Sequence, residues 1–227
     1  MSRLTLLLRK NWLWLAVNLA AAVPLLLLAW DFATDSLGIN PIDAITDRTG
    51  TAALITLIAS LAVTPINIIF GYRPIIKVRK SLGLFAFFYA ALHFLTFVGL
   101  DYGFSLYFIL QDGLVQKPYI LAGFAAFLIL LPLAITSTKG WMRRLGRNWT
   151  RLHSLVYAAG ILAVLHFIWI AKIDLGEPLI YAVVLGLLLL VRVPKVRKTI
   201  ANWRRRPSGP RPSSRELEPQ AARIEPR

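Results

Sequence analysis

Apolar residues along the chain are gathered into long uncharged runs that are separated by short charged segments. Six such runs occupy residues 11–30, 49–72, 81–100, 118–138, 152–171 and 178–191. The first five contain 20 to 24 residues each, and a helix needs roughly 20 to cross a bilayer. The sixth has 14 residues, so we expect it to recruit Arg192 and Val193 by snorkelling or to thin the bilayer locally. The pattern predicts an all-α integral membrane protein with six transmembrane helices.

Charged residues are divided unequally between the two sides that these helices define. Of the 26 Lys and Arg residues, 23 fall on the side of the chain termini, and the other side holds Arg48, Lys117, Lys172 and eight of the 11 acidic residues. Cytoplasmic loops carry the excess of Lys and Arg, so we expect both termini in the cytoplasm. The net charge of +15 is then explained by basic residues facing the anionic inner leaflet, which argues against nucleic-acid binding.

The two ends of the chain differ in character. Arg9 and Lys10 precede a first run that starts like a secretory signal with small residues for cleavage. The run continues to Trp30, however, so we expect a retained first helix. We divide the chain into a cytoplasmic N-terminus (1–10), a six-helix transmembrane domain (11–193) and a basic tail (194–227). The tail has no periodic apolar face and is expected to be unstructured.

Haem binding is suggested by the histidines, all three of which lie inside apolar runs. His93 belongs to the third run, and His153 and His166 belong to the fifth. An imidazole in hydrocarbon is expensive and normally marks a site. Neutral imidazoles from facing helices bind haem iron in a six-coordinate form suited to electron transfer. His93 with one of the other two histidines makes one complete site. The sequence therefore predicts at least one haem b, and it leaves a second open because that site lacks a histidine.

Other chemistry is limited by composition. The chain has no cysteine, which excludes disulfides, thiolate metal sites and covalent haem attachment through CxxCH. A proton channel or transporter could use the histidines as a relay, but such relays usually include buried carboxylates, and none of the six runs contains Asp or Glu. A haem-free scaffold, in which the histidines bond neighbouring helices, is the third hypothesis.

The surroundings of the histidines allow more than one interpretation. His153 and His166 are 13 residues apart, which is about 20 Å along a helix and about 140° around it. We expect Gly160 between them to mark a bend that changes this phase. Around His93, the alanines could give clearance for a macrocycle walled by Tyr89 and Phe97, or they could serve close helix packing; they are Ala86, Ala90 and Ala91.

Two further segments carry structural expectations. Pro65 is expected to loosen the second helix, with the Thr64 hydroxyl bonding a freed carbonyl. The apolar stretch 103–110 is too short to span, so it is expected either to lie in the membrane interface or to fold back as a lid. The chain shows no evident internal repeat.

Resemblance to a known family is carried by the segments GTAALITLIASLAVTPIN, RKSLGLFAFFYAALH, PYILAGF, LAITST, RRLGRNWTRLHSLVY, LHFIWIAK and PLIYAVVLGLLLLVR. Together they resemble the MsrQ (YedZ) family, the haem-binding membrane subunits of bacterial periplasmic methionine-sulfoxide reductase systems. That family is related to the transmembrane domains of ferric reductases and NADPH oxidases. The resemblance covers about residues 10–195, and its most specific part is the LH pair of the fifth run together with the LH of the third.

The resemblance implies a role in electron transfer across the bacterial inner membrane. His93, His153 and His166 match the haem-ligand histidines of the family. Members take electrons from the quinone pool and pass them to a periplasmic molybdopterin subunit, which reduces methionine sulfoxide in oxidised proteins. The family is also described as binding FMN. By this resemblance, the chain is an electron-transfer subunit with no catalytic residues of its own, and another ferric-reductase-like cytochrome b is the alternative.

Overall fold

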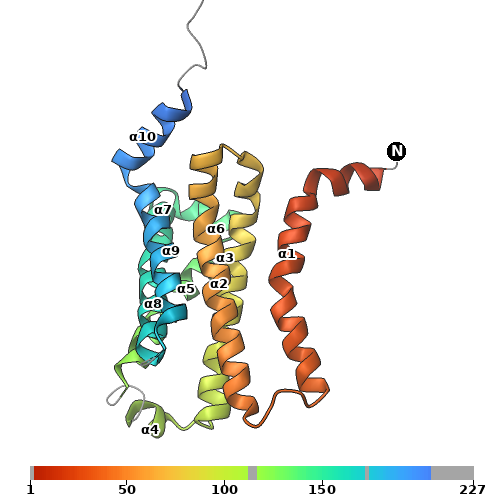
Figure 1. Ribbon diagram of the computed structural model, residues 1–227, viewed down its shortest axis with the longest axis vertical. Coiled ribbons are helices and arrows are strands. Elements are labelled where there is room, and N and C mark those ends of the chain that lie inside the picture. Colours follow the sequence, from red (N-terminus) through yellow and green to blue (C-terminus); the bar gives the residue numbers. More distant parts are fainter. Residues whose placement is uncertain (1–2, 112–116, 172–173, 206–227) are drawn as a thin grey trace, which may run out of the picture.

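The structure is a computed structural model that describes residues 3–111, 117–171 and 174–205 (Figure 1). Within these ranges all regular secondary structure is helical, which confirms the all-α prediction. The elements in chain order are α1 (Arg3–Ala33), α2 (Pro41–Phe70), η1 (Arg73–Val78), α3 (Arg79–Leu95), η2 (Thr96–Asp101), α4 (Leu106–Phe108), α5 (Pro118–Ile135), α6 (Lys139–Leu145), α7 (Arg147–Ser154), α8 (Val156–Ala171), α9 (Gly176–Arg192) and α10 (Pro194–Arg205).

Among the described residues, five helical segments are long and apolar enough to cross a membrane, and there are six if α9 and α10 count as one broken span. The chain is therefore a multi-pass membrane protein. The spans run alternately up and down (Figure 1). We call the end that carries the 34–40 connection the acidic end and the end that carries η1 and α6 the basic end. Which end faces the cytoplasm stays a prediction.

The last span differs from the expectation. The helix α9 has 17 residues and turns by 74° into α10. Residues 194–205 are thus helical, where the sequence predicted an unstructured tail. The prediction was wrong because this segment does have a short apolar face. Val196 and Ile200 lie one turn apart and are half-buried, while the basic residues between them are exposed. Residues 206–227 lie outside the described ranges.

The helix α2 starts about two turns earlier than its apolar run. Asn40 caps it by accepting a hydrogen bond from the Asp43 amide, and Pro41 occupies the first turn, a position that suits proline. The Asn40-Pro41 pair is therefore a helix start. At the other end, Gly71 closes the helix with a left-handed φ of 70°, which glycine adopts without steric cost. As a result Asp47, expected in a loop, lies on α2.

The centre of the bundle is formed by two antiparallel hairpins, α2 with α3 and α5 with α8. One buried core cluster contains a single residue from each of these four helices: Leu57, Ala86, Leu130 and Ala159. The two alanines are completely buried and allow the backbones to approach closely. The helix α9 closes a second cluster with α2 and α8, built on Leu61, Val164 and Leu185.

The helix α1 lies at the side of this bundle (Figure 1) and is held there by Tyr89 of α3. The Tyr89 side chain is 1% exposed. Its hydroxyl donates to the Ala21 carbonyl at 2.7 Å and accepts from the Leu25 amide at 3.2 Å. These two groups lie one turn apart in α1, which stays helical from Arg3 to Ala33, so the hydroxyl bridges one turn of that helix next to Pro24. Tyr89 therefore does not wall the cofactor slot, which was one of the two interpretations that the sequence left open.

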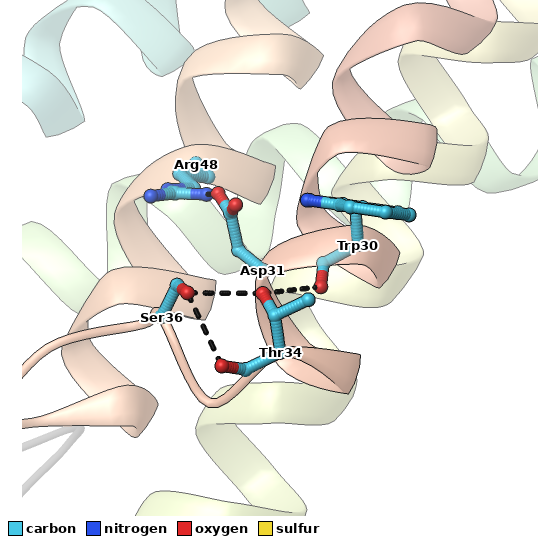
Figure 2. Close-up of polar contacts among 5 residues, drawn as sticks. All are labelled: Trp30, Asp31, Thr34, Ser36 and Arg48. Atoms are coloured by element: carbon cyan, nitrogen blue, oxygen red, sulfur yellow. Dashed lines mark hydrogen bonds and ion pairs between the residues drawn. The ribbon is translucent and has the colours of Figure 1, made fainter.

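The connection between α1 and α2 is fixed by polar contacts at the acidic end. Figure 2 shows the Arg48 guanidinium of α2 paired with Asp31 of α1. Beside it, the Thr34 hydroxyl donates to the Trp30 carbonyl at 2.9 Å and lies 2.9 Å from the Ser36 hydroxyl. The Trp30 carbonyl also accepts the Thr34 amide at 2.9 Å, so these bonds reinforce the last turn of α1.

The sixth span is joined to the bundle by an inward-pointing arginine. Pro65 has no amide hydrogen, so the Leu61 carbonyl four residues earlier loses its helical partner. Arg192 Nη2 donates to that carbonyl at 2.6 Å, and Nη1 donates to the Tyr157 hydroxyl at 2.5 Å. Arg192 therefore does not snorkel outward as expected. The Thr64 hydroxyl, expected to serve the freed carbonyl, instead accepts a bond from an arginine of α3.

Candidate functional site

A cavity of about 550 Å³ lies between α2, α3, α5 and α8, near the acidic end. This volume is within the range of about 300–1,000 Å³ found for cofactor sites. Its lining is almost entirely apolar and includes His93 and His166. The segment after α3 folds over it, since Val98, Leu106 and Ile109 also line the cavity. Stretch 103–110 was expected either to lie in the membrane interface or to fold back as a lid, and its contact with the cavity supports the lid.

The two histidines enter the cavity from opposite hairpins, His93 from the last turn of α3 and His166 from α8. Each is oriented by a backbone carbonyl of its partner helix. His93 Nδ1 lies 2.9 Å from the Thr46 carbonyl, and His166 Nδ1 lies 2.6 Å from the Tyr119 carbonyl. Since a carbonyl can only accept, each Nδ1 carries the proton and each Nε2 keeps its lone pair. Both rings are therefore in the tautomer that binds a metal through Nε2.

The separation of the rings fits one metal ion between them. Their centroids are 6.1 Å apart and their planes are inclined by 83°. An imidazole nitrogen binds a transition metal at about 2 Å, so two axial imidazoles on one ion have ring centres about 6 Å apart once each ring's own radius is added. The arrangement thus has the spacing of a pair of axial ligands.

The set of donors also indicates what kind of metal centre fits. No group of three or more His, Cys, Asp or Glu side chains is placed to hold a metal within the described part of the chain. Two imidazoles alone do not complete a tetrahedral site, which takes three or four protein ligands. They do complete the coordination of an iron that a planar macrocycle already holds by four nitrogens. The residues present therefore fit a haem.

The cavity has an internal two-fold pattern that the sequence reading missed. His93 and His166 are 73 residues apart in the sequence, and many of the other lining residues form pairs with the same separation. The first hairpin, α2–α3 with the start of η2, contributes one member of each pair: Asp47, Gly50, Thr51, Ala53, Leu54, Leu57, Ala90, Phe94 and Phe97. The second hairpin, α5–α8, contributes the other members in the same order: Ile120, Gly123, Phe124, Ala126, Phe127, Leu130, Ala163, Phe167 and Ile170. Each hairpin therefore supplies one half of the cavity and one histidine.

His153 lies elsewhere, at the basic end on α7. Its Nε2 is 3.0 Å from the Thr136 hydroxyl, and its ring stacks on Trp149 with centroids 4.0 Å apart. The Thr136 hydroxyl itself donates to the Pro132 carbonyl at 2.6 Å. His153 therefore does not line the cavity, and the histidine that faces His93 is His166.

The fifth span is interrupted between its two histidines, but not where expected. The break is at Leu155, whose amide bonds the Leu152 carbonyl three residues back at 3.0 Å. Gly160 instead lies inside α8, where it packs against Leu61 and Leu185. Asp47, which was placed outside the spans, lines the cavity. Of the other residues expected around His93, Ala90 and Phe97 line the cavity.

Comparisons with known proteins find relatives over most of the chain. A family profile described as "Ferric reductase like transmembrane component" matches residues 49–164, from α2 into α8. A protein of Xanthomonas euvesicatoria pv. vesicatoria (strain 85-10) is 46% identical over 194 residues, which are 82% of this chain and 88% of that protein. Its name is "Protein-methionine-sulfoxide reductase heme-binding subunit MsrQ". A Rhodospirillum rubrum protein of the same name is 48% identical over 186 residues, 81% of this chain and 89% of its own length.

The chain belongs to the MsrQ family. The family resemblance that the sequence segments carried is thereby confirmed, and so is the relation to ferric-reductase-like membrane domains. The profile match covers Thr49 to Val164, which includes His93 and His153 and ends two residues before His166. It thus spans nearly the whole unit that surrounds the cavity.

Proposed function

We propose that this protein is a haem b electron-transfer subunit in which His93 and His166 are the axial ligands. The observation that carries the proposal is the pair of imidazole rings, 6.1 Å apart in an apolar cavity, each with Nδ1 bonded to a carbonyl. The names of the relatives, which describe haem-binding subunits of a methionine-sulfoxide reductase, support it.

A haem iron with two histidine ligands has no open position and serves electron transfer rather than oxygen binding. The protein's own contribution is to orient the ligands and to exclude water. The carbonyls of Thr46 and Tyr119 fix the tautomer and raise the basicity of each imidazole. The lid residues Leu106 and Ile109 cover the acidic end of the cavity and keep it apolar.

We further propose the route that the family resemblance implies. Electrons enter from the quinone pool at the bacterial inner membrane, with both termini in the cytoplasm. They leave toward a separate periplasmic molybdopterin subunit, which reduces methionine sulfoxide in oxidised proteins. The cavity near the acidic end is consistent with delivery on that side. FMN is included on resemblance alone, with no residue assigned to it.

His153 is proposed as a ligand of a second haem at the basic end. Its position one helix break away from His166 keeps it out of the first site. Its ring stacks on Trp149, and binding of iron through Nε2 would require that nitrogen to give up its bond with the Thr136 hydroxyl. This proposal makes a separate prediction, because loss of His153 would remove one haem and leave the other.

The test is a reduced-minus-oxidised visible spectrum of the purified chain, with haem quantified per polypeptide. We expect sharp low-spin b-type bands, which His93→Ala and His166→Ala abolish for the first site. His153→Ala is the matched comparison and should retain those bands. A colourless protein from haem-replete cells, with its helical content intact, would contradict haem binding. The presence of His93 and Asp47 in the same cavity would then favour a proton relay.

A further inference from the structure

We propose that Gly50 and Gly123 are positioning residues that set the two imidazole planes at right angles to each other. The proposal rests on the haem site proposed above and deepens it. Neither glycine is a ligand. Each acts through a histidine, by leaving room for that ring to reach a helix carbonyl.

The need for glycine follows from helix geometry. The carbonyl of residue i in an α-helix is bonded to the amide of residue i+4, so the side chain at i+4 stands beside that oxygen. A second donor can approach the oxygen from outside only if the side chain at i+4 is very small. Thr46 and Gly50 have this relation, and so do Tyr119 and Gly123. The same device therefore occurs once in each hairpin.

The clearances show that no other residue fits without movement. A Cβ built on Gly123 would lie 2.8 Å from both Nδ1 and Cε1 of His166. A Cβ on Gly50 would lie 3.0 Å from Nδ1 and 3.1 Å from Cε1 of His93. Both contacts are with the edge of the ring that bonds the carbonyl, so relief would require turning the ring or lengthening that bond. Gly186 of α9 differs, since a Cβ there would have nothing within 4 Å.

Ring orientation is the property that these contacts determine. Each imidazole bonds one carbonyl through Nδ1 and lies against one glycine at its edge. Both the carbonyl and the glycine come from the other helix of the same hairpin. The result is an inclination of 83° between the ring planes. Perpendicular axial imidazoles give a ferric low-spin haem a strongly anisotropic electron paramagnetic resonance (EPR) signal dominated by one low-field line. Rings that are nearly coplanar give a rhombic signal with three resolved lines.

The experiment is EPR spectroscopy of the oxidised full-length protein with its haem bound. We expect the strongly anisotropic signal in the wild type. Gly123→Ala should shift intensity into a rhombic signal or into haem loss, and Gly50→Ala should do the same to a smaller extent because its clearance is larger. Gly186→Ala is the matched control, a helical glycine with open space, and should leave the spectrum unchanged.

A second measurement applies if an alanine variant fails to accumulate with haem. Thermal stability of Gly123→Ala is compared with that of Gly123→Ala/His166→Ala, each against its own parent. We expect the alanine to destabilise the chain that keeps His166 and to leave the His166→Ala parent unaffected. Equal destabilisation in both backgrounds overturns the positioning role, and so does an unchanged spectrum in both glycine variants. A rhombic wild-type signal overturns the perpendicular arrangement. Absence of haem from the wild type contradicts the proposed function itself.

Discussion

Substitution of Arg192 by Met tests whether the arginine serves the carbonyl that Pro65 leaves free. Its guanidinium donates to the Leu61 carbonyl at 2.6 Å and to the Tyr157 hydroxyl at 2.5 Å. Hydrogen bonds to a charged group contribute about 1.5–3 kcal/mol each. The remaining nitrogen, Nε, is buried without a partner, which offsets part of that gain. We therefore expect Arg192→Met, which keeps the apolar stem, to lower the free energy of unfolding by about 3 kcal/mol.

The origin of this loss is isolated by a double-mutant cycle with Pro65→Ala. An alanine at position 65 supplies an amide that bonds the Leu61 carbonyl within α2, so Arg192 is no longer needed there. We expect the cost of Arg192→Met to fall by about 1.5 kcal/mol in the Pro65→Ala background, the contribution of one of its two bonds. Packing lost with the buried Pro65 ring is common to both arms of the cycle and cancels.

The assay is unfolding of the purified protein in mixed micelles by increasing SDS, followed by the helical circular dichroism signal. Arg197→Met on α10 serves as the control, because Arg197 is exposed and should change stability by less than about 0.5 kcal/mol. If Arg192→Met costs the same in the wild-type and Pro65→Ala backgrounds, the arginine does not replace the missing helical bond, and the explanation given for its inward direction is wrong.

Three other substitutions have expected outcomes that depend on single contacts. Tyr89→Phe removes the hydroxyl that bonds two backbone groups of α1 and should cost about 1–2 kcal/mol in the same SDS assay. Asp31→Asn breaks the exposed ion pair with Arg48 and should cost less than about 1 kcal/mol, an effect that high salt removes. Gly99→Ala places a Cβ 3.0 Å from the Phe104 ring, so it should displace the lid and speed proteolysis of that segment. Equal proteolysis of variant and wild type would argue against this last effect.

The bundle could be predicted from the sequence because crossing a membrane demands long uncharged runs, and these are directly visible. Helix boundaries were less accessible. Asn40-Pro41 is typical of a turn, but the same pair also caps a helix and occupies its first turn, and only the packed structure distinguishes the two uses. Likewise Arg192 follows an apolar run at the membrane boundary, where snorkelling is the usual outcome. Its inward direction depends on a carbonyl freed 131 residues away.

The site was predicted as a set of histidines but not as a pair. His153 and His166 could each have faced His93, and the break at Leu155 that separates them leaves no signature in the residue types. One signal was present and overlooked. Gly50 precedes His93 by 43 residues, and Gly123 precedes His166 by the same number. A search for repeated spacing of glycine and histidine, rather than for repeated residues, would have paired His93 with His166 and shown the two hairpins.

The hydroxyl of Tyr89 has a consequence for how the chain is assembled during synthesis. The first helix enters the bilayer well before α3 is made, and alone in lipid its amide at Leu25 must bond the carbonyl at Ala21, because an unpaired backbone group there costs several kcal/mol. The bonds between α3 and α1 can therefore form only when Tyr89 arrives beside Pro24. We expect α1 to insert early as a separate, continuous helix and to acquire its contact with α3 as a late step of biogenesis.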